Sequence, residues 1–279
     1  MSAATSEAGY QGPTLVGSDA RRFFTLTWTL AATDYKLRFY GSVLGYVWTL
    51  ARPFLFFAVI YFVFTEIVGL DKSVENYGVY ILFALVLFQF FSEATNNCVN
   101  CLVTRESLLR KMRFPRLVIP LSVVLTALFN LFMTLIAVFV FALASGITPH
   151  VGWLELPVII VLLAAFATGV GLLLASLFVR YRDVQPIWEV ATQILFYASP
   201  VLYVATMVPE SYQRAYLANP LAALLTETRH AVVDPDARHV WDAIGAPERI
   251  LIPVAIVLLT LALGAWVFRR EAPRIAENL

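Results

Sequence analysis

The chain has 279 residues, of which 60 % are hydrophobic and only 14 % are charged, and its formal net charge is +1. A soluble domain is about half apolar and a quarter charged, so this composition excludes an ordinary soluble enzyme. Because only helices and closed barrels can span a bilayer, and the apolar runs here are long, we expect an all-α integral membrane protein.

The first part of the chain divides into two segments. Residues 1–18 are small and polar, and they predict a disordered cytoplasmic tail without a cleavable signal. In residues 19–40, apolar side chains such as Phe23, Leu26 and Leu30 recur at helical spacing between charged ones. This pattern predicts an amphipathic helix lying in the membrane interface. A soluble helix packed on the bundle is the alternative interpretation.

Residues 41–279 form the predicted transmembrane domain. Its six apolar stretches are each long enough to cross a bilayer of about 30 Å, and they cover residues 46–70, 77–103, 117–146, 156–179, 185–208 and 250–268. The connection over residues 209–249 is unusually long. Two short helices at 210–218 and 221–233, dipping back into the bundle, fit its pattern, and a separate outer cap is the alternative.

Orientation follows from the loop between the second and third spans. The basic residues of this loop are Arg105, Arg110, Lys111, Arg113 and Arg116. Lys and Arg near spans stay on the cytoplasmic side, and most of the 20 Lys and Arg residues fall on the side of this loop. We therefore predict a multi-pass plasma-membrane protein with both termini in the cytoplasm.

The same loop is predicted to contain a helix of about two turns. Thr104 is placed to cap it, Glu106 suits its first turn, and Phe114 precedes a proline that ends it. Such a helix suits docking to a soluble partner, while the simpler interpretation is a loop that only sets topology.

Polar residues inside the spans are candidates for a hydrophilic path. In the second span Glu93, Asn96, Asn97 and Asn100 follow i, i+3, i+4, i+7 spacing and share one helix face. In the fifth span Glu189 and Gln193 share a face. Polar groups at this depth face protein or water, so they either line a conduit or hold helices together by hydrogen bonds. Aromatic residues near these positions could stack on sugar rings, and the alternative is that they face lipid or the core; the candidates are Tyr40, Trp48, Tyr61, Trp188 and Tyr197.

Several motifs, taken in order, resemble ABC-2-type polysaccharide export permeases. They are LRFYGSVLGYVWTLARP at 37–53, FPRLVIP at 114–120, RYRD at 180–183, SPVLY at 199–203, Pro209-Glu210 and Asn219-Pro-Leu221. This Wzm-like family includes O-antigen exporters, and the resemblance extends to permeases of lipid-linked galactan. It covers nearly the whole chain.

The resemblance implies a homodimer of six-span subunits above two separate ATP-binding cassette ATPase subunits. It places a channel between the permeases, bordered by the first and fifth spans, and makes the N-terminal amphipathic helix a flank of its entrance. It implies that ATP and magnesium bind the partner subunit, and that residues 105–113 transmit its motion, with Arg105, Glu106, Leu109, Arg110, Lys111 and Arg113 as coupling residues. The implied substrate is a glycan on a polyprenyl diphosphate, for which Arg38 is the candidate ligand because a guanidinium matches phosphate oxygens. A contact with a lipid head group is the alternative role for Arg38.

Two other classes remain open from the residues alone. An ion-coupled transporter tends to have internal repeats and midplane charges, and no repeat is evident here. A membrane enzyme acting on lipid diphosphates would need clustered carboxylates for Mg²⁺. The tight acidic pair is Asp234-Pro-Asp236, which a turn explains. The chain has no phosphate-binding loop. We therefore expect no enzymatic activity, catalytic residue, bound metal or cofactor in this chain, and no nucleic-acid partner.

Overall fold

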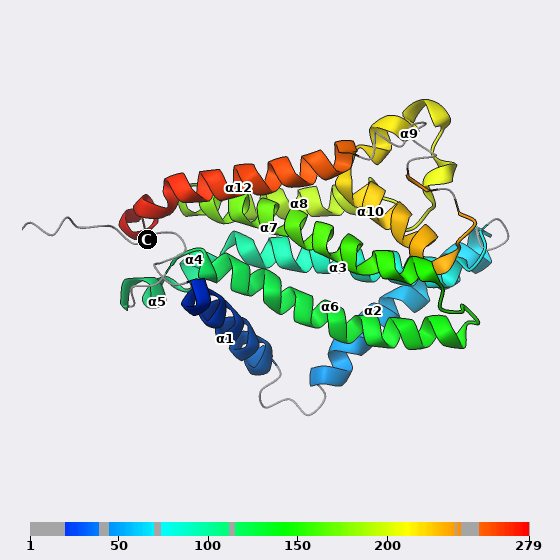
Figure 1. Cartoon of the computed structure of the whole chain (residues 1–279), viewed down its shortest axis with the longest axis horizontal. Coiled ribbons are helices and arrows are strands. Elements are labelled where there is room, and N and C mark those ends of the chain that lie inside the picture. Colours follow the sequence, from blue (N-terminus) through cyan, green and yellow to red (C-terminus); the bar gives the residue numbers. More distant parts are fainter. Residues whose placement is uncertain are drawn as a thin grey trace, which may run out of the picture.

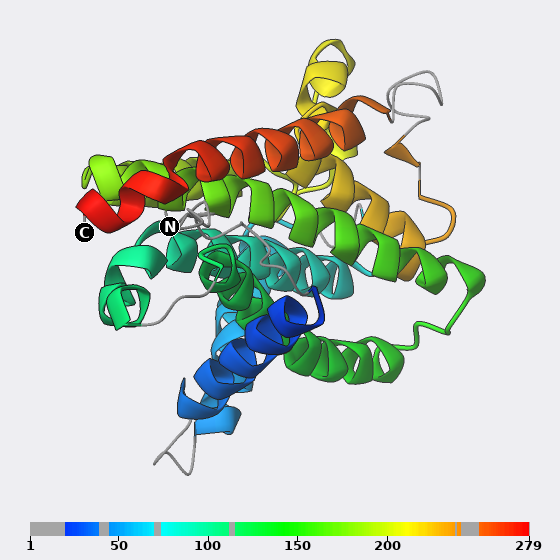
Figure 2. The same ribbon diagram turned by 60° about the vertical axis from the view of Figure 1, so that its left-hand side comes forward.

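The computed structural model describes residues 20–38, 45–69, 74–111, 115–237, 239–240 and 251–278, and all the regular structure in these ranges is helical. Long helices lie side by side along the molecule, and α1 (Ala20–Arg38) crosses them at one end (Figures 1 and 2). The prediction of an all-α membrane protein is therefore confirmed.

Five helical segments in the described residues are long and apolar enough to span a membrane. They are α2 (Gly45–Phe62) with its π-helical continuation η1 (Val63–Ile67), α3 (Tyr77–Val99), α6 (Val118–Ala144), α7 (Leu156–Arg180) with the preceding turn η3 (Val151–Glu155), and α12 (Leu251–Asn278). Four of them match the predicted first four spans, and α12 continues past the predicted end of the sixth.

The predicted fifth span is shorter than expected as a helix. Helix α8 (Val184–Tyr197) has 14 residues, about 21 Å at 1.5 Å per residue. Pro200 lacks an amide donor and disfavours a helical conformation for the residue before it, so turns and the short η4 (Ala205–Met207) follow. The segment as a whole still runs from the α7 end toward α10 (Figure 1).

Two buried tyrosines of α3 hold this non-helical turn. The Tyr77 hydroxyl donates to the Leu202 carbonyl at 2.6 Å, and the Tyr80 hydroxyl bonds the Pro200 carbonyl and lies 3.0 Å from that of Tyr203. Carbonyls freed from a helix at membrane depth need such internal donors. The break in helix α8 is therefore built into the core.

Helix α3 is the centre of the bundle. Its residues between Tyr77 and Phe91 are almost all buried, and it packs against α6, α7 and α2. Helices α7 and α12 approach each other still more closely. The backbones are so near that a Cβ on Gly264 would lie 2.3 Å from the Gly169 carbonyl oxygen. Small residues permit this backbone contact, as is common between membrane helices.

Helix α1 is amphipathic, as its spacing predicts. Phe23, Thr27 and Ala31 form its buried stripe, and the Thr126 hydroxyl of α6 lies 3.3 Å from the Ala31 carbonyl. Phe24 and Trp28 are 69 % and 59 % exposed. A surface helix with a second apolar face suits a membrane interface.

Two short helices follow α3. Helix α4 (Cys101–Thr104) comes first and α5 (Glu106–Lys111) second. The prediction that Thr104 caps the loop helix is wrong, because Thr104 ends α4 and its hydroxyl donates to the Asn100 carbonyl at 3.0 Å. The C-terminal ends of α7 and α12 lie at the same end of the bundle as α5 (Figures 1 and 2). We call this the basic end, for its Arg105, Arg180, Arg182, Arg269 and Arg270.

The opposite end, called the α10 end, contains the long connection. Here α9 (Glu210–Leu217) projects outward, whereas α10 (Pro220–Thr228) and the π-helical η5 (Arg229–Val233) are mostly buried (Figure 1). Helix α10 packs on α3, α7 and α12. Asn219 starts α10 by accepting a hydrogen bond from the Leu221 amide at 3.1 Å, an ordinary N-cap.

Candidate functional site

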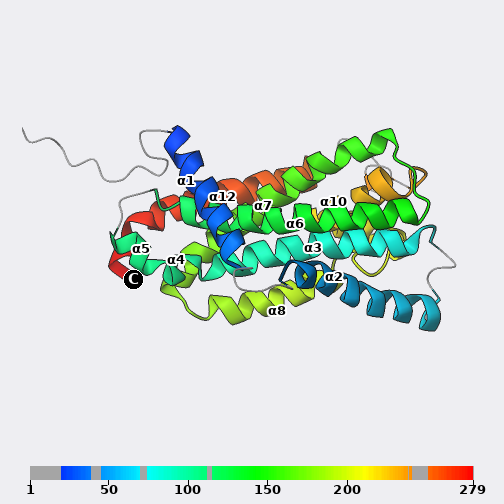
Figure 3. The ribbon, with the colours of Figure 1, turned by 90° about the horizontal axis from the view of Figure 1, so that it is seen from below.

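A large open groove lies between α2, α3 and α8. Its volume is about 1050 Å³, and α2 and α8 lie on the same side of α3 (Figure 3). Ten of its lining residues are polar: Arg52, Gln89, Ser92, Asn96, Asn97, Asn100, Gln185, Glu189, Thr192 and Gln193. We call these residues and the space between them the polar groove.

Helical spacing explains why the polar groove forms. On α8, Gln185, Glu189 and Gln193 recur every four residues and face the groove, while Ile187, Val190 and Ile194 are exposed on other faces. On α3, Gln89 and Asn97 are exposed although the residues around them are largely buried. The polar face of each helix is thus turned to a shared space.

Helix α2 supplies the third wall. Pro53 and Phe56 line the groove beside Arg52, and Pro53 leaves the Thr49 carbonyl without its usual helical donor. Among the described lining residues Arg52 is the cation and Glu189 the carboxylate, and Gln185 donates to Glu189 at 3.2 Å. The remaining polar groups are neutral amides and hydroxyls.

Six of the predicted candidates line the polar groove: Asn96, Asn97, Asn100, Glu189, Gln193 and Tyr197. Trp188 instead packs inward, where its Nε1–H donates to the Thr95 hydroxyl at 3.1 Å. Tyr61 stacks on Phe57 with ring centroids 5.5 Å apart. Trp48 is 64 % exposed and does not line the groove, and Tyr40 lies outside the described residues.

Glu93 and Arg38 are paired with each other beside the groove. Arg38 Nη1 lies 2.5 Å from Glu93 Oε1, which also accepts a hydrogen bond from Asn130 at 2.7 Å. This links α1 to α3 and α6. Glu93 therefore faces a second cavity of about 240 Å³, which Asn97 and Asn100 share with the polar groove.

The predicted coupling residue Arg105 also contacts α1. Its guanidinium forms an ion pair with Asp34 and donates to the Ser122 hydroxyl at 3.0 Å. The Arg105 and Asp34 side chains are 20 % and 27 % exposed, so this pair is partly sheltered from solvent. The start of α5 is thereby connected directly to the amphipathic helix.

Two further residues of the coupling segment, Glu106 and Leu109, are half-buried at the basic end. Leu109 packs against a small cluster that includes Leu102 and Phe268, and Glu106 lies in the first turn of α5. The backbones of Arg110 and Lys111 belong to α5, whereas Arg113 lies outside the described residues. Partial burial lowers the pKa of Arg116 beyond the helix, and an arginine there stays charged.

Sequence reasoning missed five of the groove residues, namely Arg52, Gln89, Ser92, Gln185 and Thr192. A signal was present on α8, where a helical wheel through Glu189 and Gln193 also passes Gln185 and Thr192. On α3 the helical spacing predicted the polar face, but it did not predict that α2 and α8 line the same groove. Within the described ranges, no three His, Cys, Asp or Glu side chains come together as metal ligands.

The fold and the groove define a class first. A helical bundle of membrane-spanning length with a polar groove along three of its helices is a multi-pass membrane protein. Residues 25–232 match the ABC-2 type transporter family. The chain belongs to this family, whose members are permease subunits rather than enzymes, and the resemblance seen in its motifs is confirmed.

Relatives that match nearly the full chain have related printed names. The chain is 31 % identical over 256 residues to the O-antigen export system permease protein RfbA of Myxococcus xanthus, covering 90 % of this chain and 94 % of that one. It is 28 % identical over 257 residues to RfbA of Klebsiella pneumoniae, with 92 % and 95 % coverage. The polysialic acid transport protein KpsM of Escherichia coli is 23 % identical over 246 residues, with 86 % and 91 % coverage.

Proposed function

We propose that this chain is the permease subunit of an ABC transporter that exports a polysaccharide linked to polyprenyl diphosphate, of the O-antigen or galactan type, across the plasma membrane. Two copies would form the pathway, and two separate ATPase subunits would supply ATP hydrolysis. The observation that carries the proposal is the polar groove between α2, α3 and α8, together with the O-antigen and polysialic acid exporters among the relatives.

The chemistry of the groove suits a glycan. Carboxamides and hydroxyls both donate and accept hydrogen bonds, as sugar hydroxyls do. Phe56, Phe196 and Tyr197 add aromatic surface beside Asn97 and Gln193, and such surface stacks on sugar rings. Neutral, repeated contacts of this kind favour passage of a polymer over tight binding of one unit.

A second copy would close the groove. Only 17 % of the spanning window of α2 is buried in the single chain, and Ile187, Val190 and Ile194 leave α8 with exposed apolar faces. A groove with two weakly packed walls is half of a channel when two copies meet at α2 and α8. These exposed faces support a dimer, which would give them a partner other than lipid.

The proposed orientation places the basic end in the cytoplasm. Arginines cluster there on α7, α12 and the turn before α5, as the positive-inside rule requires. Residues 184–207 would complete the fifth of six crossings, with α8 as the helical part and the tyrosine-held turn as the rest. Both termini then lie on the cytoplasmic side, and α5 faces the ATPase.

Arg38 is the proposed ligand of the lipid diphosphate. Its side chain is 38 % exposed, and it lies where α1 meets α3. A diphosphate would compete with Glu93 for the guanidinium, since phosphate oxygens accept two parallel N–H bonds. Binding of the head group at the entrance would thus loosen α1 from α3.

Transport by the full complex tests the proposal. The permease and its ATPase subunit are reconstituted in vesicles, and ATP-dependent delivery of a radiolabelled lipid-linked glycan is measured by its accessibility to an impermeant glycosidase. We expect Asn97→Leu with Gln193→Leu to reduce delivery more than fivefold, roughly the loss of one or two hydrogen bonds. Thr260→Val is the matched control, because Thr260 is a polar residue of α12 outside the groove.

Delivery that needs an ion gradient instead of ATP would contradict the proposal. So would full delivery by the Asn97→Leu, Gln193→Leu variant. Chemical crosslinking between cysteines introduced on the exposed face of α8 tests the dimer separately. If no crosslink joins two copies, lipid alone covers this face and the proposed dimer is wrong.

A further inference from the structure

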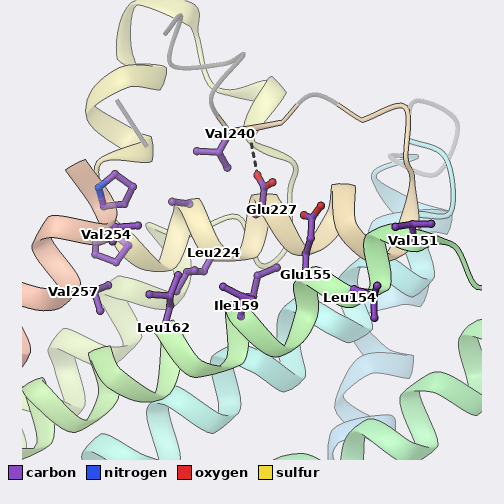
Figure 4. Close-up of a pocket in the computed structure, with 14 residues that line it drawn as sticks. Val151, Leu154, Glu155, Ile159, Leu162, Leu224, Glu227, Val240, Val254 and Val257 are labelled. Carbon is purple, nitrogen blue, oxygen red and sulfur yellow. Dashed lines mark hydrogen bonds between the residues drawn. The ribbon is translucent and has the colours of Figure 1, made fainter. Parts of the chain in front are cut away.

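A second, mostly apolar cavity lies at the α10 end of the molecule. It occupies about 380 Å³ between the start of α7, α10 and the start of α12, within the usual size range of small-molecule sites. It is separate from the polar groove, since the two share no lining residue. Figure 4 shows its residues arranged around one space.

The deeper part of this cavity is hydrocarbon. Ile159 and Leu162 come from α7, Leu224 from α10, and Val254 and Val257 from α12 (Figure 4). Val158, which also lines the cavity, is 59 % exposed, so the space is open at the surface of a membrane-spanning helix. A surface facing lipid and lined in this way fits an acyl chain.

The rim is acidic. Glu155 at the start of α7 and Glu227 on α10 both line the cavity, and their carboxylates lie above the apolar floor (Figure 4). Glu227 accepts hydrogen bonds from the Val240 amide at 3.1 Å and from His239 at 3.0 Å. Glu155 forms no ion pair or side-chain hydrogen bond with another described residue.

None of the described residues that line this cavity is a lysine or an arginine. Arg229, the arginine of η5, pairs with Asp234 at 3.1 Å and is 16 % exposed, and it does not line the cavity. His239 is the remaining basic group beside Glu227, and it compensates a charge only when protonated. An apolar slot with a negative rim is complementary to an amphiphile whose head group is cationic.

We propose that this cavity binds a phospholipid with a primary-amine head group, drawn from the membrane leaflet at the α10 end. One acyl chain fills the slot between α7, α10 and α12, and the ammonium donates hydrogen bonds to Glu155 and Glu227. An ammonium with three N–H donors makes charge-assisted hydrogen bonds to carboxylates. A trimethylated head group has the same charge but no such donor.

The inference does not depend on the proposed function, because it concerns a site away from the polar groove and invokes neither ATP nor a glycan. Purified full-length chain is equilibrated with micelles containing equal amounts of dioleoyl phosphatidylethanolamine, phosphatidylcholine and phosphatidylglycerol. Native mass spectrometry then measures which lipid stays bound. We expect phosphatidylethanolamine to be retained about tenfold over the other two, the factor for one charge-assisted hydrogen bond.

Two pairs of matched variants locate the site. Glu155→Gln with Glu227→Gln should abolish the preference, whereas Glu210→Gln on α9, at the same end but outside the cavity, should leave it unchanged. Val158→Phe should narrow the slot and lower retention of phosphatidylethanolamine. Val161→Phe should not, since Val161 is 66 % exposed on the same helix and does not line the cavity.

Equal retention of the three lipids by the unaltered chain would overturn the inference, and so would a preference that survives the double glutamine substitution. A measurement on the unaltered chain covers the case in which a variant fails to fold. Added phosphatidylethanolamine should raise the melting temperature more than phosphatidylcholine does, because a ligand of the native state stabilises it. An equal shift by both lipids would count against the site.

Discussion

Helices α3 and α2 are both apolar enough to span a membrane, yet their surroundings differ sharply. In α3, 78 % of the spanning window is buried inside the chain, whereas in α2 the figure is 17 %. Apolar composition therefore predicts that a helix spans the membrane, but it does not predict whether the helix contacts other helices or remains exposed. Helix α3 is the core of the bundle. Helix α2, together with α8, lines the polar groove and leaves an exposed face for a second copy or for lipid.

The largest effect is expected when a buried side chain of α3 is removed. Phe91 is fully buried and stacks on Phe166 at 5.3 Å between ring centroids. Phe91→Ala should lower the free energy of unfolding by about 3 kcal/mol, because it leaves a cavity among packed side chains. Phe56→Ala on α2, a residue that is 54 % exposed, should change it by less than about 0.5 kcal/mol. Thermal unfolding in one detergent compares them, and similar losses would break the contrast.

A second test enlarges a side chain where two helices touch. Gly264→Ala would put a Cβ 2.3 Å from the Gly169 carbonyl oxygen, so α12 has to move away from α7. The expected cost is about 2 kcal/mol, typical of overpacking. Leu263→Ala is the neighbouring control, since Leu263 is 50 % exposed. An unchanged melting temperature for Gly264→Ala would show that this contact is looser than the structure has it.

A smaller effect is expected where α3 supports α8. Tyr80→Phe removes the hydroxyl that bonds the Pro200 carbonyl, and an unmade hydrogen bond at a buried carbonyl costs about 1 kcal/mol. Tyr197→Phe, on a ring that is 69 % exposed, should cost nothing measurable. Amide hydrogen exchange in residues 198–204 measures the local stability of the turn. Equal protection in both variants would mean that the turn is stable without the Tyr80 hydroxyl.

The smallest effect on stability belongs to the groove. Asn97→Ala changes an exposed side chain on an otherwise buried helix, and we expect a shift of less than about 0.5 kcal/mol in the free energy of unfolding. Delivery of the glycan should fall all the same. A loss of stability as large as that of Phe91→Ala would instead make Asn97 a packing residue.

Much of this arrangement could be predicted from the sequence, because apolar length fixes the first four spans and helical spacing gives α1 its buried stripe. The rest depends on contacts. Glu93 and Asn97 sit four residues apart on one face, but that face is wide enough to meet two neighbours, so Glu93 turns to Arg38 while Asn97 opens to the groove. No periodicity distinguishes these outcomes.

The length of the fifth helix was missed for a similar reason. The apolar run over 185–208 continues past Tyr197, while Pro200 stops the helix itself. The carbonyls left free where the helix ends accept hydrogen bonds from the hydroxyls of Tyr77 and Tyr80, which lie more than a hundred residues earlier in the chain. Donors that distant in sequence become visible only in three dimensions.

The glycine contact between α7 and α12 limits how the molecule can move. With the Gly169 oxygen set directly against the Gly264 backbone, neither helix can twist or slide past the other without a steric collision. This contact holds together α7 and α12, two of the described helices that are long enough to span a membrane. If the proposed function holds, widening of the pathway has to come from α2 and α8, which pack on α3 outside this glycine contact.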